Sequence, residues 1–131
     1  AILKEELQTF NWNEVDEYPS FSKCDSATTK QERKQCFESI LTSHITGVLQ
    51  KDTIVVSQDI EDTLILQLQI SEKGVLSVLS INVDSLTNQE IPNIKDLLLH
   101  GLDSLPKIFP ALKRGQQVKT EFKLPVIINV N

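Results

Sequence analysis

The segment 118–130 shows the most regular pattern in the chain and constrains its fold most. Every even position in this segment is apolar or Thr, whereas most odd positions are polar or charged. An alternation with a period of two residues is typical of a β-strand that buries one face. We therefore predict one long strand near the C-terminus, with one face on a core and the other in solvent.

Pro125 lies inside this strand. Because proline has no N–H to donate to a ladder, a sheet accepts it only where its nitrogen faces no neighbouring strand. At least part of the predicted strand therefore has a free edge. A free edge tends to pair with other chains unless it is covered, which is the first functional indication in the sequence.

Two helices are predicted. The first spans residues 29–50, because Thr29 and Glu32 have the spacing of a capping box and an apolar stripe follows. His44 lies on that stripe, and we interpret it as a hydrogen-bonded core residue. The second helix begins near Ile91 and Pro92, since proline suits a first helical turn. Its stripe comprises Ile94, Leu97, Leu98, Gly101, Leu102 and Leu105.

A hairpin is predicted between these helices. Residues 64–70 alternate as a strand, residues 72–74 supply a turn, and residues 75–83 return with β-branched side chains. The alternation changes phase in the returning strand, which predicts a β-bulge near Val78. The short apolar run 54–56 also resembles a strand.

Length and composition favour one globular domain. The chain has 131 residues, of which 40% are hydrophobic, and it has no apolar run of the roughly 20 residues that a membrane span needs. Residues 1–25 hold four of the seven aromatic residues but no sustained period. We predict that residues 1–25 are an ordered arm or the end of a linker, and that residues 26–131 are the domain.

The net charge of −5 argues against nucleic-acid binding, which requires a basic face. Residues 106–123 nevertheless hold five basic residues and one acidic residue. This cluster has two interpretations, a solvated face and a surface that docks a partner. The sequence favours neither.

No motif indicates catalysis, a metal or a cofactor. The four glycines are too scattered for a phosphate-binding loop, and Asp59, Glu61 and Asp62 lack the spacing of a calcium loop. Cys24 and Cys36 lack the near neighbours of a zinc site. We therefore predict that the chain is not an enzyme. A hydrolase would need a pocket that collects His44 or His100 with a carboxylate and a nucleophile.

Three parts of the chain carry a family resemblance: a C-terminal part made of three motifs, a hairpin and a lead-in segment. Residues 105–110, 114–118 and 122–128 are similar to a Leu-Pro-x-aromatic-x-Pro step, an Arg-Gly-x-x-Val turn and a final Leu-Pro-Val strand. Residues 64–83 resemble the hairpin, and residues 15–21 the lead-in segment, of the same family. The chain thus resembles the TonB C-terminal domain family, in the form found in Bacteroidota.

The resemblance implies an α+β fold in which two helices pack on a small antiparallel β-sheet with the C-terminal strand at an edge. It also implies that this edge pairs with an extended peptide of an outer-membrane receptor, as part of energy-coupled transport in the periplasm. No nucleic acid, small-molecule substrate or cofactor is expected. The implied partner-binding residues are Lys113, Arg114, Val118, Lys119, Thr120, Glu121, Phe122, Lys123, Leu124, Pro125, Val126, Ile127, Ile128 and Asn129, within a surface that runs to Asn131.

Two further expectations follow from the resemblance. Some family members carry a cysteine pair at the corresponding positions, so we expect a disulfide between Cys24 and Cys36. Any signal peptide, membrane helix, lipid anchor or proline-rich spacer would precede Ala1, because the chain does not begin with methionine. The alternative function is a stand-alone envelope adapter or structural protein of the same fold, which forms homodimers through the edge strand.

Overall fold

The computed structural model describes residues 9–51 and 54–130. Within these residues the chain forms a five-stranded sheet, three α-helices and two short 3-10 helices. In chain order they are β1 (Thr9–Asn11), η1 (Trp12–Glu14), η2 (Ser22–Cys24), α2 (Lys30–Lys51), β2 (Ile60–Ile70), β3 (Leu76–Asn82), α3 (Ser85–Glu90), α4 (Ile94–Leu102), β4 (Ala111–Lys113) and β5 (Gln116–Val130).

The sheet is mixed rather than antiparallel as predicted. Its strand order is β1-β5-β2-β3, and β4 also pairs with β5. β2 and β5 pair antiparallel from Ile60 opposite Val130 to Ile70 opposite Thr120, whereas β1 runs parallel to β5. A parallel pair needs a long connection, which nearly the whole chain provides between β1 and β5. β1 was not predicted, because three residues are too few to show a period.

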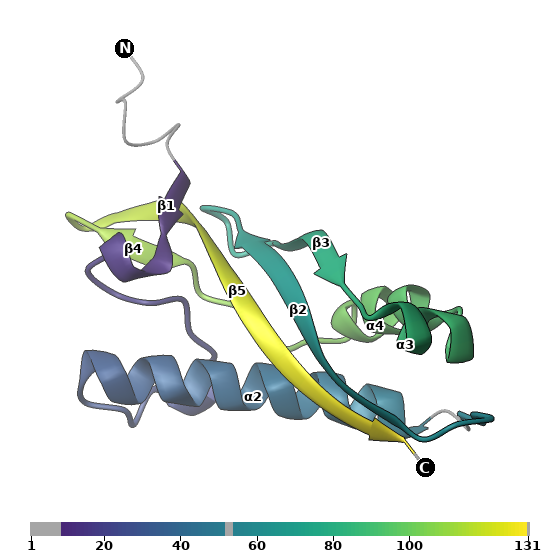
Figure 1. Ribbon diagram of the computed structural model, residues 1–131. Helices are drawn as coiled ribbons and strands as arrows, with labels where there is room; N and C mark the ends of the chain where they lie inside the picture. The colour runs from purple at the N-terminus through teal and green to yellow at the C-terminus, as the bar shows by residue number, and fades with distance from the viewer. Residues whose placement is uncertain (1–8, 52–53, 131) are drawn as a thin grey trace.

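The sheet forms one layer and α2 lies across its buried face (Figure 1). The predicted alternation is confirmed, since the even positions of β2 and β5 point inward and the odd positions point outward. The inward residues comprise Ile60, Asp62, Leu64, Leu66, Leu68, Ile70, Val118, Thr120, Phe122, Leu124, Val126 and Ile128. Apart from the polar Asp62 and Thr120, these side chains belong to the hydrophobic core.

The first predicted helix is confirmed as α2. Its N-terminus is capped by Thr29, whose Oγ1 accepts a hydrogen bond from the N–H of Glu32 at 3.0 Å. The Glu32 carboxylate accepts from the N–H of Thr28 at 3.2 Å, so the return bond of the capping box comes from one residue earlier than predicted. α2 packs against α4 at Gly101, where a side-chain carbon would come within 2.5 Å of a Val48 methyl group.

The second predicted helix corresponds to α4, and an unpredicted helix, α3, precedes it, so three α-helices replace the predicted two. α3 ends at Glu90, and α4 begins at Ile94. Between them Ile91 has φ −128° and ψ 73°, outside the helical region. Pro92 explains this break, because proline disfavours the helical conformation of the residue before it. α3 was missed because its polar sequence carries no apolar stripe.

The predicted hairpin and its bulge are confirmed. Gln67 pairs with Ser80 and the next residue, Leu68, pairs with Val78, so Leu79 is the extra residue on β3. The predicted short strand at 54–56 is wrong, because these residues belong to no strand.

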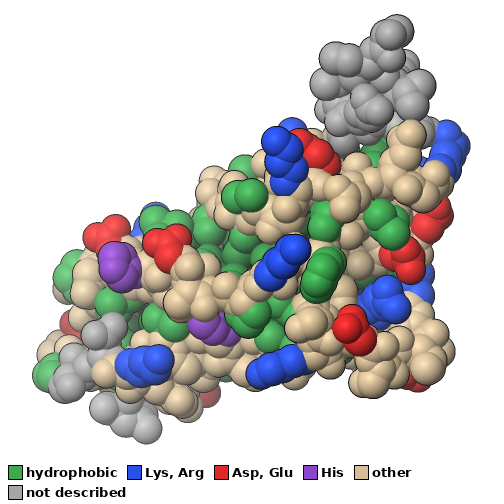
Figure 2. Space-filling view, turned by 180° about the vertical axis from the view of Figure 1, so that it is seen from behind, with side chains coloured by type: hydrophobic (Ala, Val, Ile, Leu, Met, Phe, Trp, Pro, Cys, Tyr) green, Lys and Arg blue, Asp and Glu red, His purple; other side chains and the backbone are tan. Residues whose placement is uncertain are grey.

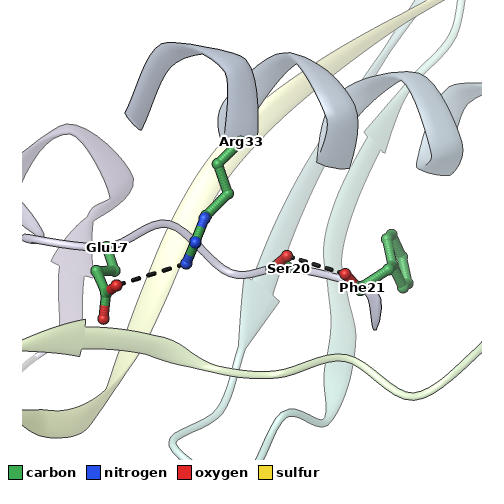
Figure 3. A network of polar contacts seen from close by, with 4 residues as sticks. All are labelled: Glu17, Ser20, Phe21 and Arg33. Atoms are coloured by element: carbon green, nitrogen blue, oxygen red, sulfur yellow. Dashed lines mark hydrogen bonds and ion pairs between the residues drawn. The ribbon is translucent and has the colours of Figure 1, made fainter. Parts of the chain in front are cut away.

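Residues 9–25, the described part of the predicted N-terminal arm, pack into the same core as the sheet and helices. Trp12 is buried and stacks on Phe122 with ring centroids 4.4 Å apart. Arg33 of α2 lies 3.4 Å from the Glu17 carboxylate, near Ser20, whose hydroxyl donates to the carbonyl of Phe21 at 3.0 Å (Figure 3). Tertiary contacts therefore order this segment although its sequence shows no period.

The predicted disulfide between Cys24 and Cys36 is confirmed. It joins the end of η2 to the second turn of α2, with 5.8 Å between the Cα atoms and 12 positions between the residues in sequence. The disulfide thereby fixes the end of the N-terminal segment to α2.

Candidate strand-pairing edge

β5 has two edges, which differ in how much of their length is covered. β2 covers one edge along residues 120–130. β1 covers the other edge only at residues 119–121, and β4 pairs with residues 116–118. From Phe122 to Val130, within the described part of the chain, no strand lies on that second edge. We call this nine-residue stretch the open edge.

The expectation of a C-terminal strand at the edge of the sheet is therefore corrected in part. In the strand order β5 lies between β1 and β2, so it is not a terminal strand. Within the described residues, β5 has a free edge only after Glu121, where the three-residue β1 no longer pairs with it. Two of the implied residues already have strand partners on both sides. Thr120 lies between Phe10 of β1 and Ile70 of β2, and Glu121 lies between Asn11 of β1 and Gln69 of β2.

The place of Pro125 indicates which main-chain groups the open edge presents. Pro125 lies opposite Ile65 of β2, within a register that has no irregularity. Its nitrogen costs no ladder hydrogen bond when it points to the open edge. Along a strand, the N–H and C=O groups of every second residue point to the same edge. The N–H and C=O groups of Lys123, Ile127 and Asn129 therefore point to the open edge, as the Pro125 nitrogen does.

The side chains at the open edge alternate in the same way. Leu124, Val126 and Ile128 are buried on the helix side. Lys123, Pro125, Ile127 and Asn129 are exposed on the other side, and Ile127 is 75% exposed. An apolar residue with this exposure, beside free main-chain groups, marks a surface that another chain can cover.

A pocket of about 270 Å³ lies at the Val130 end of the open edge. Its walls come from the last turns of α2, the residues around the α3–α4 break, Ile54 and the end of β5. Apolar side chains, including those of Leu49, Ile91 and Ile94, make up most of the lining. The sequence did not predict this pocket, because its walls come from four separate segments.

The predicted basic turn is engaged within the chain. Lys113 Nζ donates to the carbonyl of Glu14 at 2.6 Å, and the N–H of Arg114 donates to the Asp16 carboxylate at 2.7 Å. Arg114 and Gly115 have φ values of 54° and 76°, as the tight turn of a two-residue hairpin requires. This turn holds the N-terminal segment against β4.

The structure thus separates the implied partner-binding residues into two groups. Lys113, Arg114, Val118, Lys119, Thr120 and Glu121 lie where β4, β1 or the N-terminal segment already contact them. Phe122, Lys123, Leu124, Pro125, Val126, Ile127, Ile128 and Asn129 lie on the open edge. Asn131 is outside the described residues.

The space-filling view from the side opposite to Figure 1 shows charges of both signs dispersed over that face, with no patch of a single sign (Figure 2). That face has no dominant charge of either sign. It offers no concentrated positive surface of the kind that binds phosphates.

The polar groups outside the open edge serve the fold. His44 Nε2 lies 2.8 Å from the carbonyl of Gly101 and 3.1 Å from Ser104 Oγ, which links α2 to the end of α4. The predicted hydrogen bonding of His44 is thus confirmed, but its side chain is half-buried and does not belong to the core. His100 is exposed on α4. Neither histidine has a hydrogen bond to a carboxylate in the described structure.

Two carboxylates near β2 and α3 have shifted pKa values in opposite directions. Hydrogen bonds from the hydroxyl and N–H of Ser57 and from the N–H of Gln58 lower the pKa of Glu90. The pKa of Asp84 is raised chiefly by the negative charge of nearby Asp62. A hydrogen bond between the two carboxyl groups is the next largest cause. Glu90 thereby attaches the loop before β2 to the end of α3.

No group of three or more His, Cys, Asp and Glu side chains in residues 9–51 and 54–130 is arranged to hold a metal ion. The described helices are each too short or too polar to cross a membrane. Comparison of the chain with family models, curated proteins and solved structures finds no match. The geometry of the open edge therefore carries the functional conclusion.

Proposed function

We propose that the chain is a protein-binding domain that takes up an extended peptide by strand addition along the open edge of β5. The observation that carries the proposal is the stretch 122–130, which pairs with β2 on one side and with no described strand on the other. In strand addition, main-chain hydrogen bonds supply affinity and alternate side chains supply selectivity.

The layer beneath the open edge supports this proposal. α2 lies across the buried face of β5 (Figure 1), and Phe37 and Leu41 of α2 belong to the same core as Leu124 and Val126. A strand added beside β5 would extend this two-layer arrangement. Its inward side chains would gain apolar contacts in addition to the ladder hydrogen bonds.

For the identity of the peptide we propose what the family resemblance implies. The partner is then a segment of an outer-membrane receptor, and the domain acts in the periplasm as part of energy-coupled transport. The Cys24–Cys36 disulfide is compatible with an oxidising compartment. The alternative partner is a second copy of the chain, which would pair through the same edge in an envelope adapter, and the exposed Ile127 favours an edge that is covered in the assembly.

The test is titration of the domain with receptor-derived extended peptides, followed by backbone amide chemical shifts. We expect the largest shifts at Lys123, Ile127 and Asn129. Shifts confined to β3 or to the helices would contradict the proposal. Light scattering of the free domain tests the alternative, because a homodimer through the open edge would double the mass and block the peptide.

Two substitutions at Ile127 separate the main-chain contribution from that of the side chain. Ile127→Pro removes an outward N–H, and we expect it to weaken peptide binding by about tenfold, since a hydrogen bond contributes about 0.5–1.5 kcal/mol and the ladder is also interrupted. Ile127→Thr keeps the N–H and serves as the matched control. Equal affinities of the two variants would argue against pairing at this position.

A further inference from the structure

We propose that the pocket at the Val130 end of the open edge receives one aliphatic side chain of the added strand and so selects the peptide. This inference rests on the proposed function and specifies the chemistry of the partner. The pocket measures about 270 Å³, just below the roughly 300–1,000 Å³ of typical small-molecule sites. A large aliphatic side chain fits such a volume better than a whole cofactor does.

The pocket is continuous with the open edge. Four consecutive residues of β5, 127–130, line it. Since neighbouring side chains of a strand point to opposite faces, a pocket that touches all four must also reach their main chain. β2 covers the main chain on its own side, where Ile60 to Thr63 pair with Val130 to Ile127. The pocket therefore adjoins the last four residues of the open edge, 127–130.

The lining determines what the pocket accepts. Leucine and isoleucine side chains dominate, and the polar members are Thr46, Gln50 and Asn129. None of the described residues that line the pocket is Asp, Glu, Lys or Arg. A charged side chain would lose its hydration there without a partner. An aliphatic side chain would instead gain from burial.

The register of β5 determines which peptide residue enters. Residues directly opposite one another on paired strands place their side chains on the same face. Ile128 points inward, so the peptide residue opposite Ile128 points toward the pocket side. The residue opposite Lys123 points to the exposed face and meets its ammonium group. The preferred peptide therefore carries an aliphatic residue and an acidic residue five positions apart.

A panel of nine-residue, threonine-rich peptides tests this prediction. Each peptide carries one Glu and one Leu, placed four, five or six positions apart and in both orders, and each has a counterpart with Ala in place of Leu. We expect the five-residue spacing to bind best, and its Ala counterpart to bind about 10- to 100-fold more weakly, from the free energy of burying an aliphatic side chain. The preferred order of Glu and Leu reports whether the added strand is parallel or antiparallel.

A filled pocket provides the matched protein control. Gln50 is exposed at the pocket, so Gln50→Trp places an indole over it with little effect on the core. Gln35→Trp makes the same change at an exposed position nearer the start of α2. We expect Gln50→Trp to abolish the preference for Leu over Ala, whereas Gln35→Trp keeps it.

The outcomes distinguish the two proposals. If all peptides bind equally and the amides of Lys123, Ile127 and Asn129 still shift, the pocket inference is overturned while strand addition stands. The pocket inference also fails if Gln50→Trp leaves the preference for Leu unchanged. If none of the peptides, including those from receptors, shifts these amides, both proposals are overturned.

Discussion

Two strand edges of seven residues or more lack a paired strand in the described part of the chain, and they differ in regularity. β3 ends the strand order, and its outer edge spans Leu76–Asn82. The extra residue Leu79 interrupts its register with β2. The open edge of β5 keeps an unbroken register over nine residues. Because a bulge twists an edge and disrupts its ladder, bulged edges resist pairing. The comparison indicates that the β5 edge is the more regular template of the two, although Pro125 supplies no N–H to it.

The β5 edge also carries residues that restrict pairing. Lysine and proline are common on edge strands, where they discourage unspecific association, and Lys123 and Pro125 lie in the first half of the open edge. The second half, 126–130, has neither and adjoins the apolar pocket. This half is therefore the part of the edge that is most receptive to a partner.

Truncation of one side chain in each strand should show the largest difference in stability between β5 and β3. Phe122 of β5 is 3% exposed and contacts the rings of Trp12 and Phe37, so Phe122→Ala should lower the free energy of unfolding by about 3–5 kcal/mol. Leu79 of β3 is 46% exposed, and Leu79→Ala should change the free energy of unfolding by less than about 0.5 kcal/mol. Chemical denaturation measures both. Similar losses would mean that β3 is packed as tightly as β5.

Removal of the disulfide should have the next largest effect. The bridge closes a loop between residues 12 apart, so the Cys24→Ala, Cys36→Ala double variant should lose about 2–3 kcal/mol of stability. The disulfide fixes the segment that carries β1, which pairs with β5 and not with β3. Amide hydrogen exchange should therefore accelerate at residues 119–121 more than along β3. Uniform acceleration would argue against this local role.

The pH dependence of stability should reveal the contact between Glu90 and the loop before β2. Because the folded pKa of Glu90 lies below its ordinary value of 4.5, its contribution is present above pH 4.5 and is lost as pH falls through the folded pKa. Glu90→Gln should thus lower the thermal midpoint at pH 7 and leave it nearly unchanged at low pH. This loop also carries Ile54 to the pocket at β5.

Asp84, which follows β3, provides a control because its pKa is shifted in the opposite direction to that of Glu90. Its folded pKa is raised above 3.8 by the charge of Asp62, so ionisation of Asp84 costs stability as pH rises through the folded pKa. Asp84→Asn should raise the thermal midpoint at pH 7 and lose this advantage at low pH. The same pH dependence in both variants would show that the two shifts do not govern stability.

The smallest expected effect concerns charge at the two edges. Lys123→Glu should weaken binding of the Glu-containing peptide by up to about fivefold, since an exposed ion pair contributes about 0.2–1 kcal/mol. Lys73→Glu, in the turn before β3, should leave the affinity unchanged. Isothermal titration at low and high salt measures both variants. A loss that persists in high salt would exclude an electrostatic origin.

Local patterns predicted the elements that carry a strong signal. The cap at Thr29, the alternation from Val118 onward and the phase change near Val78 each mark their element within a few residues. α3 and β1 were missed because a polar helix has no apolar stripe and a three-residue strand has no period. Pro92 was assigned to a first helical turn, whereas it lies in the break between two helices.

The site was predicted only as far as one residue type could indicate it. Pro125 pointed to a free edge, because the missing N–H is a local property. The open edge begins after Glu121 because Asn11, more than 100 positions earlier in the chain, pairs with Glu121. The pocket is formed by residues from four separate segments. Such pairings are set by the packing of the whole core, which the sequence pattern of a single segment does not contain.

The short parallel strand β1 gives the open edge a fixed end. Asn11 lies beside Glu121, the residue that immediately precedes the open edge. An incoming segment that pairs from the Val130 end can advance along β5 only until it meets this residue. β1 thus sets a fixed stop for an added strand at one end of the open edge, and a segment that extends past Phe122 must turn away from β5.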